Sequence, residues 1–158
     1  MINSAIILAG GKGERLRPYT DDRPKPLVEV GGKPILAYQL DQLKKAGIET
    51  VVFACSYQRE ALQKHLDSGE KYGIKALFSV EETPLGRGGG IKKAMQMLPQ
   101  VWGNALVVNG DNLWKLDIEG LIKKHEERRA MATIVVVPLR SPYGIVEFNA
   151  ADEILGFL

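Results

Sequence analysis

Short apolar runs alternate along this chain with segments whose apolar residues recur at helical spacing. The runs are rich in β-branched residues and apolar throughout, so they predict buried strands at 5–8, 50–54, 75–80, 105–109 and 132–137. Helical spacing predicts helices at 34–46, 59–66, 91–98 and 118–129. The first of them begins with Pro34, a residue that suits the first turn of a helix. A last pair of segments, 144–148 and 153–157, predicts a short hairpin.

This order of elements predicts an α/β fold. Strands that are apolar throughout indicate a mostly parallel, Rossmann-like sheet with helices on both faces, in three layers. Ligands bind beyond the carboxyl ends of the strands in open sheets of this kind. The residues that directly follow each strand are therefore the candidates for function.

The composition narrows the class of protein. The 158 residues suffice for one domain, 1–158, with a hydrophobic core. The 21 Lys and Arg residues are balanced by 19 Asp and Glu, which argues against a nucleic-acid binder. No apolar run is long enough to cross a membrane. The single cysteine, Cys55, excludes an internal disulfide and a cysteine-based zinc cluster, so we expect a cytoplasmic protein.

The densest candidate site follows the first strand. Gly10, Gly11 and Gly13 come directly after it, and the basic residues Arg15 and Lys25 follow, Lys25 between two prolines. Glycines let backbone N–H groups approach an anion, and a guanidinium and an ammonium add charge. The stretch therefore predicts a polyphosphate site.

Two common phosphate motifs do not account for this stretch. A Walker A loop requires Gly-Lys followed by Ser or Thr, whereas Lys12 is followed by Gly13 and Lys33 by Pro34. A dinucleotide fingerprint requires a third glycine where Leu16 stands. A solvated loop with ordinary surface charges is the alternative that a lone pair of glycines would favour.

The sequence LAGGKGERLRP, followed by RPKPLVEVGGKPIL, resembles the signature of the sugar-phosphate nucleotidylyltransferases. The resemblance implies transfer of a nucleotide from a nucleoside triphosphate to a sugar 1-phosphate, with Mg²⁺, giving a nucleoside-diphosphate sugar and pyrophosphate. It implies catalytic roles for Arg15 and Lys25 on the phosphates. It also implies nucleotide contacts from the backbone of the first loop, at Leu8, Ala9, Gly10, Gly11 and Gly13. Glu14 departs from the threonine of many members.

A second glycine cluster lies in ETPLGRGGGIKKA, residues 82–94. Glycines before a helix allow a flat nucleobase to lie against the backbone, although a flexible loop explains them equally well. The family has a similar segment that contacts the nucleoside, which implies Glu82 and Gly86 as base contacts, with Glu81 as the alternative. The local GGGI form resembles members that make UDP-linked N-acetylmuramic acid. The chain as a whole resembles N-acetylmuramate-1-phosphate uridylyltransferases and mannose-1-phosphate guanylyltransferase-like members.

Asp111 directly follows the strand at 105–109, on the same sheet edge as the first glycine loop. A carboxylate there is able to hold Mg²⁺ against phosphate oxygens, and Gly110 would let the backbone close on a ribose. Gly-Asp-Asn is also ordinary turn chemistry. The resemblance implies the metal site, because V-x-x-GD is the family's metal-binding motif, and it makes Asp111 both catalytic and metal-binding.

The carboxyl-terminal part of the sequence offers candidate residues for a sugar site. Tyr143 and Gly144 match a family segment that lines the sugar site. The family's later lysine and second metal-binding aspartate have no counterpart before Leu158. We therefore expect a truncated or naturally short relative in which nucleotide binding survives better than catalysis; a homo-oligomer is one source of the missing residues. A nucleotide-binding or regulatory module and a cytidylyltransferase acting on a phospho-alcohol remain alternatives, and the base and the sugar stay open.

Overall fold

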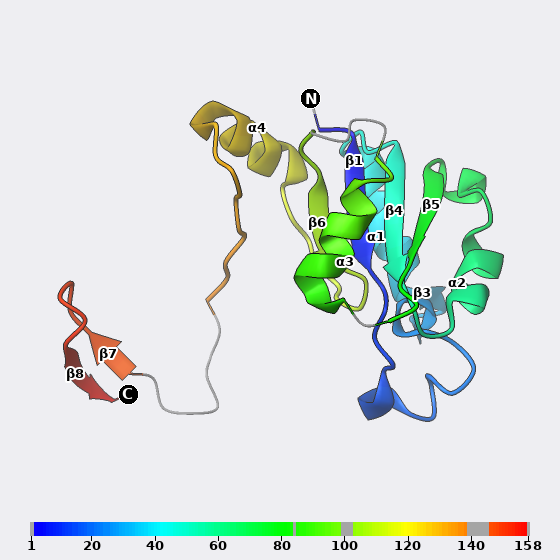
Figure 1. The fold of residues 1–158 in the computed structure, drawn as a ribbon, viewed down its shortest axis with the longest axis horizontal. Coiled ribbons are helices and arrows are strands. Elements are labelled where there is room, and N and C mark those ends of the chain that lie inside the picture. Colours follow the sequence, from blue (N-terminus) through cyan, green and yellow to red (C-terminus); the bar gives the residue numbers. More distant parts are fainter. Residues whose placement is uncertain (1, 84, 99–102, 139–145, 158) are drawn as a thin grey trace. The chain divides into compact units, whose positions relative to one another are not determined.

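The computed structural model describes residues 2–83, 85–98, 103–138 and 146–157 (Figure 1). The chain divides into two compact units, residues 1–124 and residues 125–158, and each is described by itself. None of the described helices combines the length and the apolar character that a membrane-spanning helix requires.

The first unit is built on a four-stranded sheet. Its strands are β1 (Ser4–Leu8), β4 (Thr50–Cys55), β5 (Lys75–Val80) and β6 (Leu106–Asn109), in the order β5-β4-β1-β6. All three neighbouring pairs are parallel, with Ala5 of β1 opposite Val51 on one side and Leu106 on the other. The predicted parallel sheet is confirmed, and its carboxyl ends all lie at one edge.

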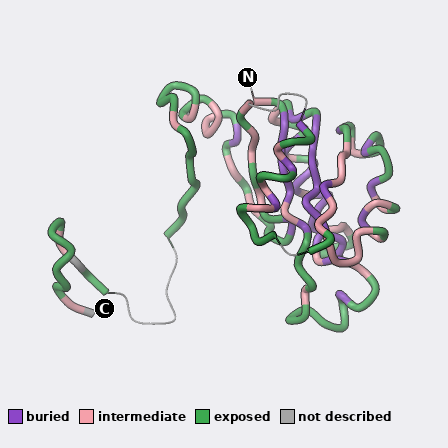
Figure 2. Tube along the Cα trace, viewed as in Figure 1, coloured by how far each residue is buried: buried purple, intermediate pink, exposed green. Residues whose placement is uncertain are grey.

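Helices cover both faces of this sheet. Ile7 and Phe53 point to the face covered by α1 (Ile35–Lys45) and α2 (Arg59–Leu66), where they join a buried cluster with Leu40. Ile6 points to the opposite face and packs against Ala94 of α3 (Gly86–Met95). Figure 2 shows that the buried residues concentrate on the central strands. The alternation arises because successive side chains of a strand point to opposite faces, and both faces are covered.

The polar stretch between β1 and α1 contains only short elements. They are two turns of 3₁₀-helix, η1 (Glu14–Leu16) and η2 (Lys25–Leu27), and a small antiparallel pair, β2 (Glu29–Val30) with β3 (Lys33–Pro34). The prediction that prolines prevent one long helix here is confirmed. A further 3₁₀ turn, η3 (Glu70–Tyr72), precedes β5.

Helix α3 begins five residues earlier than the helical spacing of the apolar residues predicts. The helical spacing starts at Ile91, yet the structure begins the helix at Gly86 and ends it at Met95 instead of Leu98. The glycine cluster is therefore the first turns of a helix and not a loop. A local contact accompanies this start: the Glu81 carboxylate accepts the N–H of Leu85, the residue before the helix, at 3.2 Å, and a Cβ on Gly90 would meet the same carboxylate.

The predicted strand at 132–137 is wrong. No strand forms there among the described residues, and the side chains of Ile134 and Val136 are 82% and 83% exposed. β-Branched residues favour an extended backbone, but a strand also needs a neighbour to complete its hydrogen-bond ladder. In the second unit, helix α4 (Ile118–Arg128), which begins in the first, ends close to its predicted boundary, and the predicted hairpin is confirmed as β7 (Val146–Phe148) with β8 (Ile154–Phe157).

The single thiol tests the packing of β4. Cys55 is 1% exposed, and burial raises the pKa of its thiol to about 11, because the charged thiolate is poorly solvated. At pH 8 roughly a thousandth of such a thiol is the reactive thiolate, and this fraction grows as the pH approaches 11. We expect the native protein to resist a thiol reagent at pH 8 and the urea-unfolded chain to react fast. A time course of thiol titration checks this, and fast labelling of the native protein would contradict the buried position.

Candidate active site

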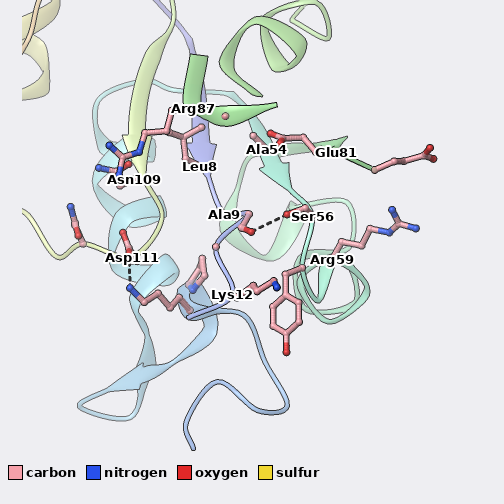
Figure 3. A pocket seen from close by; sticks show the side chains of 18 residues that line it. Leu8, Ala9, Lys12, Ala54, Ser56, Arg59, Glu81, Arg87, Asn109 and Asp111 are labelled. Carbon is pink, nitrogen blue, oxygen red and sulfur yellow. Dashed lines mark hydrogen bonds and ion pairs between the residues drawn. The ribbon is translucent and has the colours of Figure 1, made fainter. Parts of the chain in front are cut away.

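The carboxyl ends of the four parallel strands surround an open pocket of about 1030 Å³ (Figure 3). Each strand delivers residues to it: β1 through Gly10, β4 through Ser56, β5 through Glu81 and β6 through Asp111. The remaining lining residues are Leu8, Ala9, Gly11, Lys12, Lys25, Pro26, Ala54, Tyr57, Arg59, Glu82, Gly86, Arg87, Asn109 and Asn112. The pocket therefore lies where the fold class predicts a ligand.

The glycine loop after β1 is held against the end of β4. Ala9 donates its N–H to the carbonyl of Ala54 at 2.8 Å, and Ser56 donates its hydroxyl to the carbonyl of Gly10 at 2.9 Å. A Cβ on Gly10 would lie only 3.0 Å from that hydroxyl oxygen, so the close approach favours glycine. The loop enters the pocket in a defined position before any ligand binds.

Backbone donors of this loop remain available. In the part of the chain that the structure describes, no acceptor takes up the N–H groups of Gly11, Lys12 and Gly13. Gly13 adopts the left-handed conformation, with φ of 68°, and its carbonyl accepts the hydroxyl of Thr20 at 2.9 Å. Consecutive N–H groups beside a left-handed residue are the backbone geometry that binds anions.

Lys25 and Asp111 meet at the pocket although they are 86 residues apart. The ammonium Nζ of Lys25 lies 2.8 Å from Oδ2 of Asp111, and the side chains are 19% and 37% exposed (dashed line in Figure 3). Lys25 begins the turn η2, whose Pro26 is buried. This partly buried pair places one cation and one carboxylate beside the glycine loop.

Gly110 brings the backbone of β6 close to that of β1. Its N–H donates to the carbonyl of Leu8 at 2.9 Å, and a Cβ at this position would lie 2.9 Å from the same oxygen and 3.1 Å from Cγ of Pro26. The structure thus gives Gly110 a packing role. It is buried and is not among the residues that line the pocket, so the ribose contact implied by the resemblance stays a prediction.

The two glutamates after β5 differ in what they contact. Glu81 is engaged with the first turns of α3, whereas Glu82 is exposed and lines the pocket beside Gly86. Glu82 and Gly86 are therefore close enough to the pocket to serve as the predicted base contacts. Glu81 also lines the pocket, but its carboxylate is used to position α3.

The structure does not bring together every predicted residue. Arg15 lies exposed on η1, and neither Arg15 nor Gly13 lines the pocket. Tyr143 and Gly144 fall outside the described residues. Leu8, Ala9, Gly10, Gly11, Lys25, Glu82, Gly86 and Asp111 do line it.

The sequence reasoning missed one wall of the pocket. Ser56, Tyr57 and Arg59 line it, and they directly follow β4. The rule that function follows the carboxyl end of each strand contained the signal, but this segment matches no phosphate motif. Lys12 and Arg87 were missed too; with Lys25 and Arg59 they give four cationic side chains, against the carboxylates of Glu81, Glu82 and Asp111.

A divalent cation would find few protein ligands here. Among the described residues, no group of three or more His, Cys, Asp or Glu side chains is placed to hold a metal ion. Asp111 offers a single carboxylate beside the loop. Mg²⁺ is often bound in this way, through one or two carboxylates while substrate phosphates and water supply the other oxygens. The donor set fits a metal that arrives with a polyphosphate and does not fit a closed structural site.

Comparison with known proteins gives relatives along nearly the whole chain. A mannose-1-phosphate guanylyltransferase from Mycobacterium tuberculosis is 36% identical over 156 residues, which are 98% of this chain and 43% of the relative. The catalytic subunit beta of a mannose-1-phosphate guanylyltransferase from Danio rerio is 39% identical over 148 residues, 92% of this chain and 41% of the relative. This chain thus spans about two fifths of the length of the curated relatives it matches.

Solved structures share the fold. HddC from Yersinia pseudotuberculosis, complexed with GMP-PN, has a TM-score of 0.68 over 99% of this chain and 69% of its own, at 24% identity. A Bacillus anthracis protein assigned as a glucose-1-phosphate thymidylyltransferase has a TM-score of 0.79 over 99% of this chain and 63% of its own, at 23% identity. The family model described as Nucleotidyl transferase matches residues 4–158. With that match and relatives above 30% identity, this chain belongs to the nucleotidyl transferase family.

Proposed function

We propose that this chain binds a nucleoside triphosphate in the pocket and serves the transfer of its nucleotidyl group to a sugar 1-phosphate. One observation carries the proposal: the Lys25–Asp111 pair stands beside the unpaired N–H groups of the glycine loop, at the carboxyl edge of the parallel sheet. A chain of phosphates requires closely spaced donors, a nearby cation and a place for a metal ion. The three features meet in one pocket.

For this reaction the protein must position the two substrates and neutralise the negative charge of their phosphates. An oxygen of the sugar 1-phosphate attacks the α-phosphorus of the triphosphate in line, and the bond from that phosphorus to the oxygen bridging to the β-phosphate breaks. The products are a nucleoside-diphosphate sugar and pyrophosphate. The attacking oxygen is already anionic, so the step needs no general base. Two like-charged reactants must instead be held together, which preorganised donors and cations achieve.

Named residues of this chain take those roles. The N–H groups of Gly11 and Lys12, which line the pocket, bind phosphate oxygens, and Lys25 neutralises charge where the two reactants meet. Asp111 is the residue that would hold Mg²⁺; when bound, the ion withdraws charge from the phosphate oxygens. Lys25 now occupies one oxygen of Asp111. Lys25 is thus able to exchange its carboxylate partner for a phosphate when the ligands arrive.

The relatives suggest which substrates to test first. They are named mannose-1-phosphate guanylyltransferases, so GTP and mannose 1-phosphate head the panel, followed by UTP, CTP and dTTP with other sugar 1-phosphates. Calorimetry with each nucleotide tests binding, and pyrophosphate release tests transfer. We expect binding of at least one triphosphate with Mg²⁺. Binding without release would favour a nucleotide-binding module, and no binding by any triphosphate would overturn the proposal.

Replacing Lys25 tests the cation at the reacting centre. Lys25→Met keeps the aliphatic stem, whose Cγ lies near Gly13, and removes the charge. Loss of one preorganised donor costs about 10²–10³ in turnover. We therefore expect pyrophosphate release to fall by that factor. Lys75→Met is the matched control, because Lys75 is exposed at the amino end of β5, at the opposite edge of the sheet. Equal activities of the two variants would remove Lys25 from the mechanism.

Arg15 has a separate test, because the structure leaves it outside the pocket lining. If its guanidinium reaches the triphosphate in the bound state, Arg15→Ala lowers turnover by at least about a hundredfold, while nucleotide affinity changes less. Arg17→Ala is the control; the Arg17 Nε lies 3.4 Å from Oδ1 of Asp21 in an exposed pair of the kind that contributes little. Normal turnover of Arg15→Ala would show that Arg15 plays no part.

A further inference from the structure

We infer that Gln39 is a positioning residue that holds the segment 109–112 so that the carboxylate of Asp111 faces the pocket. The role of Asp111 rests on the proposed function, whereas the tie between Gln39 and the segment stands on hydrogen bonds alone. Gln39 lies on α1, and none of the candidate residues that the sequence motifs singled out lies on this helix.

One amide group bridges both ends of this segment. Nε2 of Gln39 donates to the carbonyl of Asn109 at 2.8 Å and to the carbonyl of Asn112 at 2.6 Å. These two carbonyls stand on either side of Gly110 and Asp111. Two carbonyl oxygens facing one atom fix the amide orientation, because Oε1 in that place would meet two other acceptors. The amide therefore clamps the short loop that presents Asp111.

The burial of the Gln39 side chain indicates that these two donated hydrogen bonds are its structural role. The residue is 1% exposed, and its Oε1 is buried with no partner among the described residues. An unpaired buried acceptor destabilises a fold, and an apolar side chain of similar size would avoid that cost. The side chain thus contributes through its N–H groups, and these go only to the Asp111 loop.

Other contacts hold the side chains of the loop: Lys25 pairs with the Asp111 carboxylate, and Trp114 and Leu116 pack against the core. Residues 110–117 form neither helix nor strand, so their carbonyls lack ladder partners. The N–H of Gly110 donates to Leu8, and Gln42, one helical turn from Gln39, donates to the carbonyl of Trp114. Gln39 is the side chain that ties the backbone on both sides of Asp111. Losing it would loosen the backbone around Asp111 and leave the Lys25 pair to hold the carboxylate. Once a phosphate takes Lys25, the carboxylate would be less well oriented to hold a cation.

Hydrogen exchange without nucleotide tests the tie itself. We expect Gln39→Met, which keeps length and volume but donates nothing, to raise exchange of the Gly110 amide, whose N–H is bonded to the carbonyl of Leu8 inside the clamped segment. Gln42→Met is the matched control, because it removes an amide-to-carbonyl bond of the same kind on the same helix, beyond Asp111. A rise of equal size in both variants, or none in Gln39→Met, would overturn the inference. Gln39→Asn, whose shorter amide cannot span both carbonyls, carries the same test if the methionine variant does not fold.

A binding cycle tests the link to Asp111. Residues that orient a metal ligand typically alter metal affinity by about ten- to a hundredfold. We expect Gln39→Met to weaken triphosphate binding in the presence of Mg²⁺ by about tenfold and to leave binding in EDTA unchanged. The affinity of Gln42→Met for the triphosphate with Mg²⁺ should stay within about twofold of that of the parent protein. In an Asp111→Asn background, Gln39→Met should add nothing; an equal loss there would make Gln39 a general stabilising residue. A parent protein that binds no triphosphate would overturn the proposed function, and hydrogen exchange would then decide on Gln39 alone.

Discussion

Parallel pairing of β1 with its two neighbours is the constraint on which the candidate site depends. A parallel ladder brings the carboxyl ends of its strands to one edge, so segments more than 80 residues apart leave the sheet side by side. The register pairs Leu8 with Ala54 and with Asn109. The glycine loop, Ser56 and Asp111 consequently start from one line of paired residues, and the pocket lies beyond that line.

Crowding at this edge decides which residues are tolerated there. A side chain at Gly10 would press on the Ser56 hydroxyl, and one at Gly110 would press on the backbone carbonyl of Leu8. Behind this edge of the sheet, the buried amide of Gln39 donates hydrogen bonds to the carbonyls of Asn109 and Asn112. Small residues bring the backbone together, and one long polar side chain holds it there. The site is therefore supported from the core by Gln39 as well as by loop contacts such as that of Ser56 with Gly10.

The two charged side chains beside the glycine loop, Lys25 and Asp111, are paired in the free protein. Their charged atoms lie 2.8 Å apart, and the side chains are 19% and 37% exposed, so water and a ligand both reach the pair. A ligand carrying both phosphate and a divalent cation offers each of them a new partner of the right sign. The pair therefore stabilises the empty pocket without closing it to the ligand proposed for it.

Much of this architecture follows from local pattern. The limits of α2 and β5 match the predicted segments, because apolar periodicity reports which residues face a core, and the LAGG and GD segments indicated the sheet edge that carries the pocket. The start of the glycine helix could not be predicted, because glycines are poor helix formers and the helical spacing of apolar residues begins only at Ile91. The run at 132–137 shows the converse: β-branched residues specify an extended chain, but only a neighbouring strand makes it part of a sheet. Likewise Ser56 and Gln39 carry no motif, and contacts between residues distant in sequence alone gave them their places. Periodicity and motifs are local, whereas crowding, pairing and hydrogen bonding across the fold are not.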